Sequence, residues 1–126
     1  MKDARPIAVV DDDTDLRETL GELLYEEGYE ARLFENGRTA LEFLRGGGRP
    51  KLILLDLMMP EMNGWQFREE QLKDAALRDI PVVVMTASRG FDGHGIAAQE
   101  ILYKPIGLGE LMDAVERNTR NGKGGE

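Results

Sequence analysis

The chain has 126 residues, no cysteine and a formal net charge of −8 at pH 7. This length suits one domain with its own hydrophobic core. The absence of cysteine excludes disulfides, thiolate metal sites and cysteine nucleophiles. The negative charge argues against direct binding of nucleic acid, whose phosphates require clustered Lys and Arg. No run approaches the roughly 20 apolar residues of a membrane span, and no secretory signal is recognised, so a cytoplasmic location is expected.

The first half of the chain alternates apolar runs with helical patterns. A β-branched run at 7–10 predicts a strand, and leucines at 16, 20, 23 and 24 then recur along one face of a helix. Asp13 or Thr14 is its expected N-cap, and Gly28 its expected end. A second strand is predicted at 30–34, followed by a helix around residues 40–44 that glycines 46–48 end.

The second half continues the alternation. Strands are predicted at 52–55, 82–85 and 101–103, with a helix after Gly64 and a last helix marked by residues 108, 111, 112 and 115. Strands that are apolar on both faces are typical of parallel sheets covered by helices on both sides. The alternation therefore predicts a doubly wound α/β fold. The stretch 118–126, rich in glycine and charge, is expected to be frayed.

Polar residues follow four of the predicted strands, at the edge of the sheet where such folds bind ligands. They are Asp11 and Asp12, Asp56, Thr86, and Lys104 with Pro105. Three adjacent carboxylates repel one another unless a proton or a cation lies between them. Mg²⁺ prefers such oxygen ligands, and lysine and threonine side chains can bind phosphoryl oxygens. The set suits phosphoryl transfer, with a carboxylate as a possible nucleophile.

Each of these residues also has a plain structural explanation. The acidic run 11–13 could be a solvated turn and helix cap, and Asp13 is assigned that role. Asp56 could simply end a strand, Thr86 could cap a helix, and Lys104 could be a surface charge. Their convergence on one edge of the sheet favours the functional interpretation for all except Asp13.

The motifs, in this order, resemble those of the response-regulator receiver domain, the phospho-acceptor module of two-component signalling, as in chemotaxis regulators. They are Val9-Val10-Asp11-Asp12, Leu54 to Pro60 with Met62-Asn63-Gly64, Met85-Thr86-Ala87 and Lys104-Pro105. The resemblance implies a flavodoxin-like five-stranded parallel sheet of order 2-1-3-4-5 with helices on both faces. It implies a receiver domain at 1–120, and we expect a disordered tail at 121–126.

The resemblance also implies roles for the acidic residues. Asp56 matches the aspartate that accepts a phosphoryl group. Asp12 matches the direct Mg²⁺ ligand, Asp11 its acidic neighbour, and Met58 the residue whose backbone carbonyl binds the metal. Asp56 is expected to complete the metal site.

Further roles are implied at the ends of the last two strands. Thr86 matches the switch hydroxyl that moves toward the phosphoryl group, and Ala87 matches the residue whose N–H contacts phosphate. Lys104 matches the lysine that pairs with phosphoryl oxygens, and Pro105 a structural proline usually preceded by a cis peptide.

The implied function is a phosphorylatable signalling switch rather than an enzyme in the usual sense, with autophosphorylation and slow autodephosphorylation. The implied partners are a sensor histidine kinase or phosphotransfer protein, and a downstream protein or output domain. No contact with nucleic acid or membrane is expected, and a homodimer is left open. The chain is either a stand-alone receiver or one domain of a larger regulator. Because the Met58 side chain offers no hydrogen bond to an attacking water, we expect a long-lived phosphoryl group.

Two features depart from the family pattern. Ile101 stands where receivers usually have the switch tyrosine or phenylalanine, although Tyr103 lies two residues further on the same side of the strand. Lys104 follows Thr86 by only 18 positions, and residues 88–95 include three glycines, which weaken helices. We therefore predict a fourth helix that is short, displaced or irregular. We hypothesise that a rearranged crossover, not aromatic switching, carries the output.

Two other classes of function remain as alternatives. A Mg²⁺-dependent phosphatase would need a second acid two residues after Asp56, where Met58 stands. A nucleotide- or flavin-binding module would need a phosphate-binding loop after the first strand, where residues 11–13 would repel phosphate.

Overall fold

The computed structural model describes residues 4–88 and 95–121. Five strands and four helices are found there, in the order β1 (Ile7–Val10), α1 (Thr14–Glu26), β2 (Ala31–Phe34), α2 (Gly37–Arg45), β3 (Leu52–Asp56), α3 (Gly64–Leu72), β4 (Val82–Thr86), β5 (Glu100–Tyr103) and α4 (Leu108–Asn121). All strands are parallel, in the order β2-β1-β3-β4-β5. The predicted doubly wound, flavodoxin-like sheet is confirmed.

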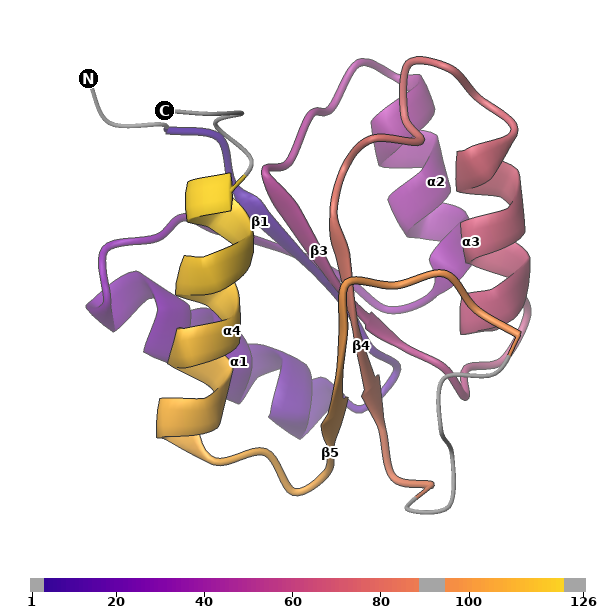
Figure 1. The fold of residues 1–126 in the computed structure, drawn as a ribbon. Helices are drawn as coiled ribbons and strands as arrows, with labels where there is room; N and C mark the ends of the chain where they lie inside the picture. The colour runs from indigo at the N-terminus through magenta and orange to yellow at the C-terminus, as the bar shows by residue number, and fades with distance from the viewer. Residues whose placement is uncertain (1–3, 89–94, 122–126) are drawn as a thin grey trace.

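Helices cover both faces of the sheet (Figure 1). Helices α1 and α4 lie on one face, and α2 and α3 on the other. Every residue of β1, β3 and β4 is buried, which explains why these strands are almost uniformly apolar. Their side chains alternate between two core clusters, one beneath α2 and α3 and one beneath α1 and α4.

The helix boundaries follow from side chains that cap them. Asp13 is the N-cap of α1, as predicted, and its carboxylate accepts a hydrogen bond from the backbone N–H of Leu16. The helix ends at Glu26, two residues before Gly28, whose φ of 93° favours glycine. Asn63 forms a reciprocal capping box with Gln66 and fixes the start of α3.

The crossover from β4 to β5 contains no helix within its described residues, 87–88 and 95–99. This agrees with the expectation of a weakened fourth helix, although residues 89–94 lie outside the described part. Ile96 and Ala98 pack against the core cluster beneath α2 and α3. The backbone N–H of Gln99 donates to the carbonyl of Val82, so the crossover re-enters the sheet directly at β5.

The last helix is longer than expected. Asn118 lies inside α4, is buried, and donates hydrogen bonds from Nδ2 to the carbonyl of Ala114 and the carboxylate of Glu100. The expectation of fraying is therefore wrong for residues 118–121, because the hydrogen bond to Glu100 connects this end of α4 to β5. Residues 122–126 of the predicted tail lie outside the described part. Among the described residues, no helix has both the length and the apolar character needed to cross a membrane.

Candidate functional site

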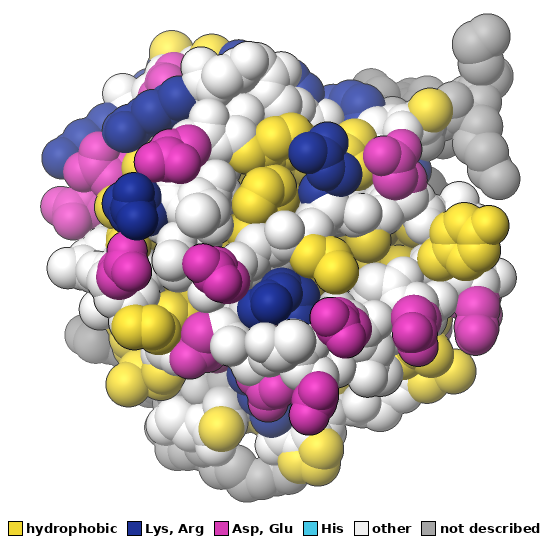
Figure 2. Space-filling view, turned by 180° about the vertical axis from the view of Figure 1, so that it is seen from behind, with side chains coloured by type: hydrophobic (Ala, Val, Ile, Leu, Met, Phe, Trp, Pro, Cys, Tyr) yellow, Lys and Arg dark blue, Asp and Glu magenta, His cyan; other side chains and the backbone are white. Residues whose placement is uncertain are grey.

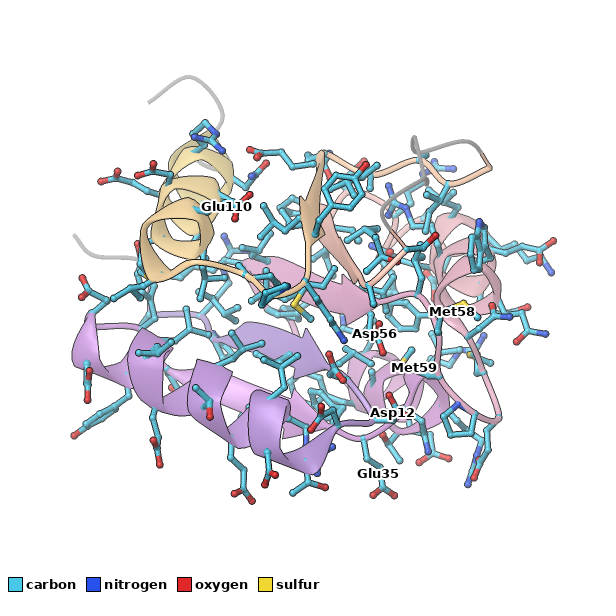
Figure 3. The ribbon with its side chains drawn as sticks, turned by 90° about the horizontal axis from the view of Figure 1, so that it is seen from below. Asp12, Glu35, Asp56, Met58, Met59 and Glu110 are labelled. Carbon is cyan, nitrogen blue, oxygen red and sulfur yellow. The ribbon has the colours of Figure 1, made fainter. Side chains whose placement is uncertain are left out.

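The polar residues predicted from the strand ends do meet at one edge of the sheet. Figure 3 looks at this edge and shows Asp12 and Asp56 close together, with Met58 to one side, toward α3. Carboxylate oxygens of Asp11, Asp12 and Asp56 all lie within 4.8 Å of one another. Parallel strands place their carboxyl ends side by side, so residues 45 positions apart form one acidic cluster.

Asp56 is the last residue of β3 and is only 3% exposed. Burial, followed by the charge of Asp11, raises the pKa of this carboxyl to about 6. Lys104 and the backbone N–H of Met58 act in the opposite direction. The Asp56 carboxylate is therefore shielded from solvent, and a positive charge beside it stabilises its ionised form.

Lys104 approaches the cluster from the end of β5. Its Nζ lies 2.9 Å from Oδ2 of Asp11 and 3.4 Å from Oδ1 of Asp56. Burial disfavours its charge, but the two carboxylates outweigh that effect and raise the pKa of Lys104. The Lys104 N–H donates to the carbonyl of Thr86, and the peptide bond to Pro105 is cis, as the family resemblance implied.

Asp11 is completely buried and is held by several groups. Its carboxylate accepts hydrogen bonds from Lys104 Nζ and from the backbone N–H of Asp13. Nη1 of Arg17 donates to the Asp11 carbonyl at 2.7 Å. The strand-end motifs of the sequence do not include Arg17. Its position four residues after the N-cap Asp13, on the first turn of α1, is the only signal that could have indicated it.

The donor set fits a hard divalent cation. Three carboxylates converge, Asp12 is exposed to solvent, and Asp56 carries an unfavourable buried charge that a cation would relieve. Lys104 Nζ lies closer to Asp11 than to Asp56, and the other carboxylate oxygen of Asp11 accepts from the Asp13 N–H, which leaves Asp12 and Asp56 as the better direct ligands. The Met58 side chain is 66% exposed and contributes no donor atom of its own suited to Mg²⁺.

Thr86, the last residue of β4, is 1% exposed and pairs with Tyr103 in the sheet register. Its Oγ1 accepts a hydrogen bond from the backbone N–H of Ser88, so the hydroxyl also organises the turn that follows. Ala87, between these two residues, is exposed. The hydroxyl and the small residue therefore lie at the same edge as the acidic cluster.

Gly64 explains why the loop after Asp56 needs a glycine. A Cβ there would lie 2.9 Å from both the Asp56 carbonyl oxygen and Cα of Leu57. The Gly64 N–H donates to the Leu57 carbonyl. The first turn of α3 therefore packs directly against the backbone at the end of β3, which fixes the position of Asp56.

Ile101 lies in β5, opposite Val84, and is half-buried against the core cluster beneath α2 and α3. The side chain is thus part of the core at the position where the family resemblance implies an aromatic switch. Tyr103 is also half-buried, on the same side of the strand.

Comparison with known sequences identifies the family. The sequence model described as "Response regulator receiver domain" matches residues 7–116. The chain is 37% identical over 110 residues to "Response regulator MprA" of Mycolicibacterium vanbaalenii, covering 84% of the chain and 46% of that protein. It is 36% identical over 115 residues to "Transcriptional regulatory protein CpxR homolog" of Haemophilus influenzae, covering 87% and 48%. The chain spans about half the length of these relatives.

Solved structures show the same fold. A signal receiver domain of a histidine kinase from Syntrophus aciditrophicus is 32% identical, with a TM-score of 0.86 over 98% of this chain and 96% of that one. The response regulator TrrA of Thermotoga maritima, solved in complex with Mg²⁺-BeF, is 34% identical, with a TM-score of 0.81 over 90% and 98%. The fold, the acidic cluster and these similarities lead to one conclusion: the chain belongs to the response regulator receiver domain family.

Proposed function

We propose that this domain accepts a phosphoryl group on Asp56 from the phosphohistidine of a sensor kinase or phosphotransfer protein, and that phosphorylation switches its conformation. The observation that carries the proposal is the buried Asp56 carboxylate, with Lys104 Nζ 3.4 Å away and two further carboxylates beside it. An aspartate that only ended the strand would not need two further acidic side chains beside it.

The transfer exchanges one bond for another. An Asp56 carboxylate oxygen attacks phosphorus, the O–P bond forms, and the N–P bond to the donor imidazole breaks. The imidazole nitrogen keeps the electron pair and takes up a proton. Lys104 balances the charge of the phosphoryl oxygens, while the Thr86 hydroxyl and the Ala87 N–H are available to donate to them.

Asp11, Asp12, Asp56 and the Met58 carbonyl would hold Mg²⁺, which supplies charge neutralisation between the acceptor and the phosphoryl oxygens. TrrA, with Mg²⁺-BeF bound, supports this assignment by similarity. In the protein itself, the crowding of carboxylates within 4.8 Å supports it.

The switching and the partners follow from the same site. We propose that Thr86 turns toward the phosphoryl group, which releases its bond to the Ser88 N–H and so disturbs the start of the crossover. The output is a downstream protein or an output domain, in a cytoplasmic signalling pathway. Since the curated relatives are about twice as long as this chain, the output is either a separate protein or a further domain of the same protein.

Intact mass after incubation with acetyl phosphate and Mg²⁺ tests the acceptor. We expect one added phosphoryl group on the wild-type protein, and none on Asp56→Asn or after chelation of Mg²⁺. The matched control is Asp13→Asn, which removes a charge from the same acidic region but keeps a good N-cap. An adduct on Asp56→Asn, or loss of the adduct in Asp13→Asn, would contradict the assignment.

A further inference from the structure

A second surface feature lies away from the acidic cluster, between α1 and β2. It is an open groove of about 1120 Å³, lined mainly by one face of α1 and by the edge of β2. Tyr25 and Leu33, two residues that line it, are 79% and 40% exposed. Figure 2 views the molecule from behind and shows a row of acidic side chains together with hydrophobic ones on its right-hand side, where α1 lies.

The groove is strongly acidic. Glu18, Glu22, Glu26 and Glu30 line it, and none of them forms an ion pair with another described residue. The first three are spaced four residues apart on α1, where like charges destabilise a helix. Helix α1 also has no basic residue in its last turn, although its dipole favours one there. These glutamates therefore destabilise helix α1. Residues that destabilise their own element are typical of binding sites.

The floor of the groove is a sheet edge. Among the described strands, β2 is the last on its side of the sheet. The carbonyls of Glu30 and Phe34 accept hydrogen bonds from the N–H groups of Ile7, in β1, and of Asp11, which follows β1. Because successive backbone groups alternate in direction, the N–H and C=O of Ala31 and Leu33 point away from β1, toward the open side.

The side chains around this edge differ on its two faces. Gly21 leaves the groove open above Leu33, since a Cβ there would lie 3.3 Å from a Leu33 methyl carbon. On the other face, the Arg32 guanidinium lies 4.8 Å from the centre of the Phe43 ring. A strand added to β2 would thus meet carboxylates on its α1 side and a positive charge on its α2 side.

We propose that this groove docks a segment of a partner protein in extended conformation, with lysine or arginine at alternate positions, added along the free edge of β2. Main-chain hydrogen bonds to Ala31 and Leu33 would hold the segment. The basic side chains would point toward the four glutamates, and the residues between them, uncharged, would face Arg32. The proposal does not depend on phosphorylation of Asp56.

Three blocked octapeptides test the proposal by amide NMR titration of the full chain. One alternates Lys and Val, the second has the same composition as a block of four Lys and four Val, and the third alternates Glu and Val. We expect the alternating Lys peptide to bind most tightly, to shift amides of residues 18–33, and to slow hydrogen exchange of the Leu33 N–H. The double variant Glu22→Gln with Glu26→Gln is expected to weaken the binding of this peptide about 2- to 30-fold, because two exposed charge pairs between the protein and the peptide are lost.

The matched control is Glu69→Gln with Asp79→Asn, two exposed acids elsewhere that leave the same net charge. It should change the affinity less than about twofold. Equal binding of the block or the Glu peptide, shifts centred on Asp12 and Asp56, or no shift in residues 18–33 would overturn the proposal. A concentration-dependent dimer formed through β2 would also overturn it, by assigning the edge to a second copy. Acetyl phosphate should label both double variants as it labels the wild-type protein.

Discussion

At the residue scale, the site is a balance of buried charges. Asp11 and Asp56 are both buried, and the positive charge of Lys104 lies within 3.4 Å of each. One lysine cannot neutralise three carboxylates, so a net negative charge remains in the cluster. This surplus disfavours the metal-free native state and favours binding of a divalent cation.

Replacing Asp56 by Asn is therefore expected to stabilise the metal-free protein at neutral pH. The pKa of Asp56 in the folded state is about 6, above its ordinary 3.8. Protonation of Asp56 therefore stabilises the folded state, fully below about pH 4, and this stabilisation is lost as the pH rises through 6. We expect Asp56→Asn to be more stable by about 1–3 kcal/mol at pH 7, with the difference fading toward pH 4. Urea unfolding in EDTA measures this difference in the free energy of unfolding, with Asp13→Asn as the control. A difference that does not change with pH would contradict the prediction.

Met58 allows a test of phosphoryl lifetime. Its exposed, apolar side chain cannot orient a water molecule for attack on the phosphoryl group. Met58→Asn supplies an amide at the same position. One hydrogen bond contributes about 0.5–1.5 kcal/mol, so we expect dephosphorylation about 2- to 10-fold faster. The decay of the phosphorylated mass over time measures this, with Met58→Leu as the apolar control; equal decay of all three proteins would show that this side chain does not set the rate.

At the element scale, the unusual feature is the crossover from β4 to β5. Nε of Arg68, on α3, donates to the carbonyl of Ala97, and Nη1 donates to the Gln71 side chain, which in turn binds the carbonyls of Leu77 and Ile80. This network fastens the described end of the crossover to α3. Burial lowers the pKa of Arg68, which has no acidic partner among the described residues.

We predict that hydrogen exchange of the crossover responds to a phosphoryl mimic. Thr86 Oγ1 accepts from the Ser88 N–H, so a hydroxyl drawn toward the mimic frees that end of the crossover. Beryllofluoride with Mg²⁺ should change protection in peptides spanning 88–99 of the wild-type protein and leave Asp56→Asn unchanged. Arg68→Met should enlarge the response, since it removes the bond to Ala97. Unchanged protection in the wild-type protein would reject the crossover as the output element.

At the scale of the whole molecule, sequence patterns were enough to predict the architecture and the meeting of the polar residues at one edge of the sheet. Apolar strands alternating with amphipathic helices defined the sheet, and polar residues after β1, β3, β4 and β5 defined the ligand edge. Contacts between distant residues were not predictable: the Arg68–Ala97 bond joins positions 29 apart, and only the folded chain brings Gly64 against the Asp56 carbonyl. Periodicity describes one element at a time, so it cannot show such pairings.

The charge of the whole molecule gives the last prediction. At a net charge of −8, the glutamates of α1 repel one another and the rest of the surface. Glu22→Gln with Glu26→Gln removes two like-charge pairs and a charge at the unfavourable end of the helix dipole, so we expect a stabilisation of about 0.5–2 kcal/mol in urea unfolding at low salt. The gain should shrink in high salt. Glu69→Gln with Asp79→Asn changes the net charge equally but relieves no such ladder, and an equal gain there would assign the effect to net charge rather than to the α1 surface.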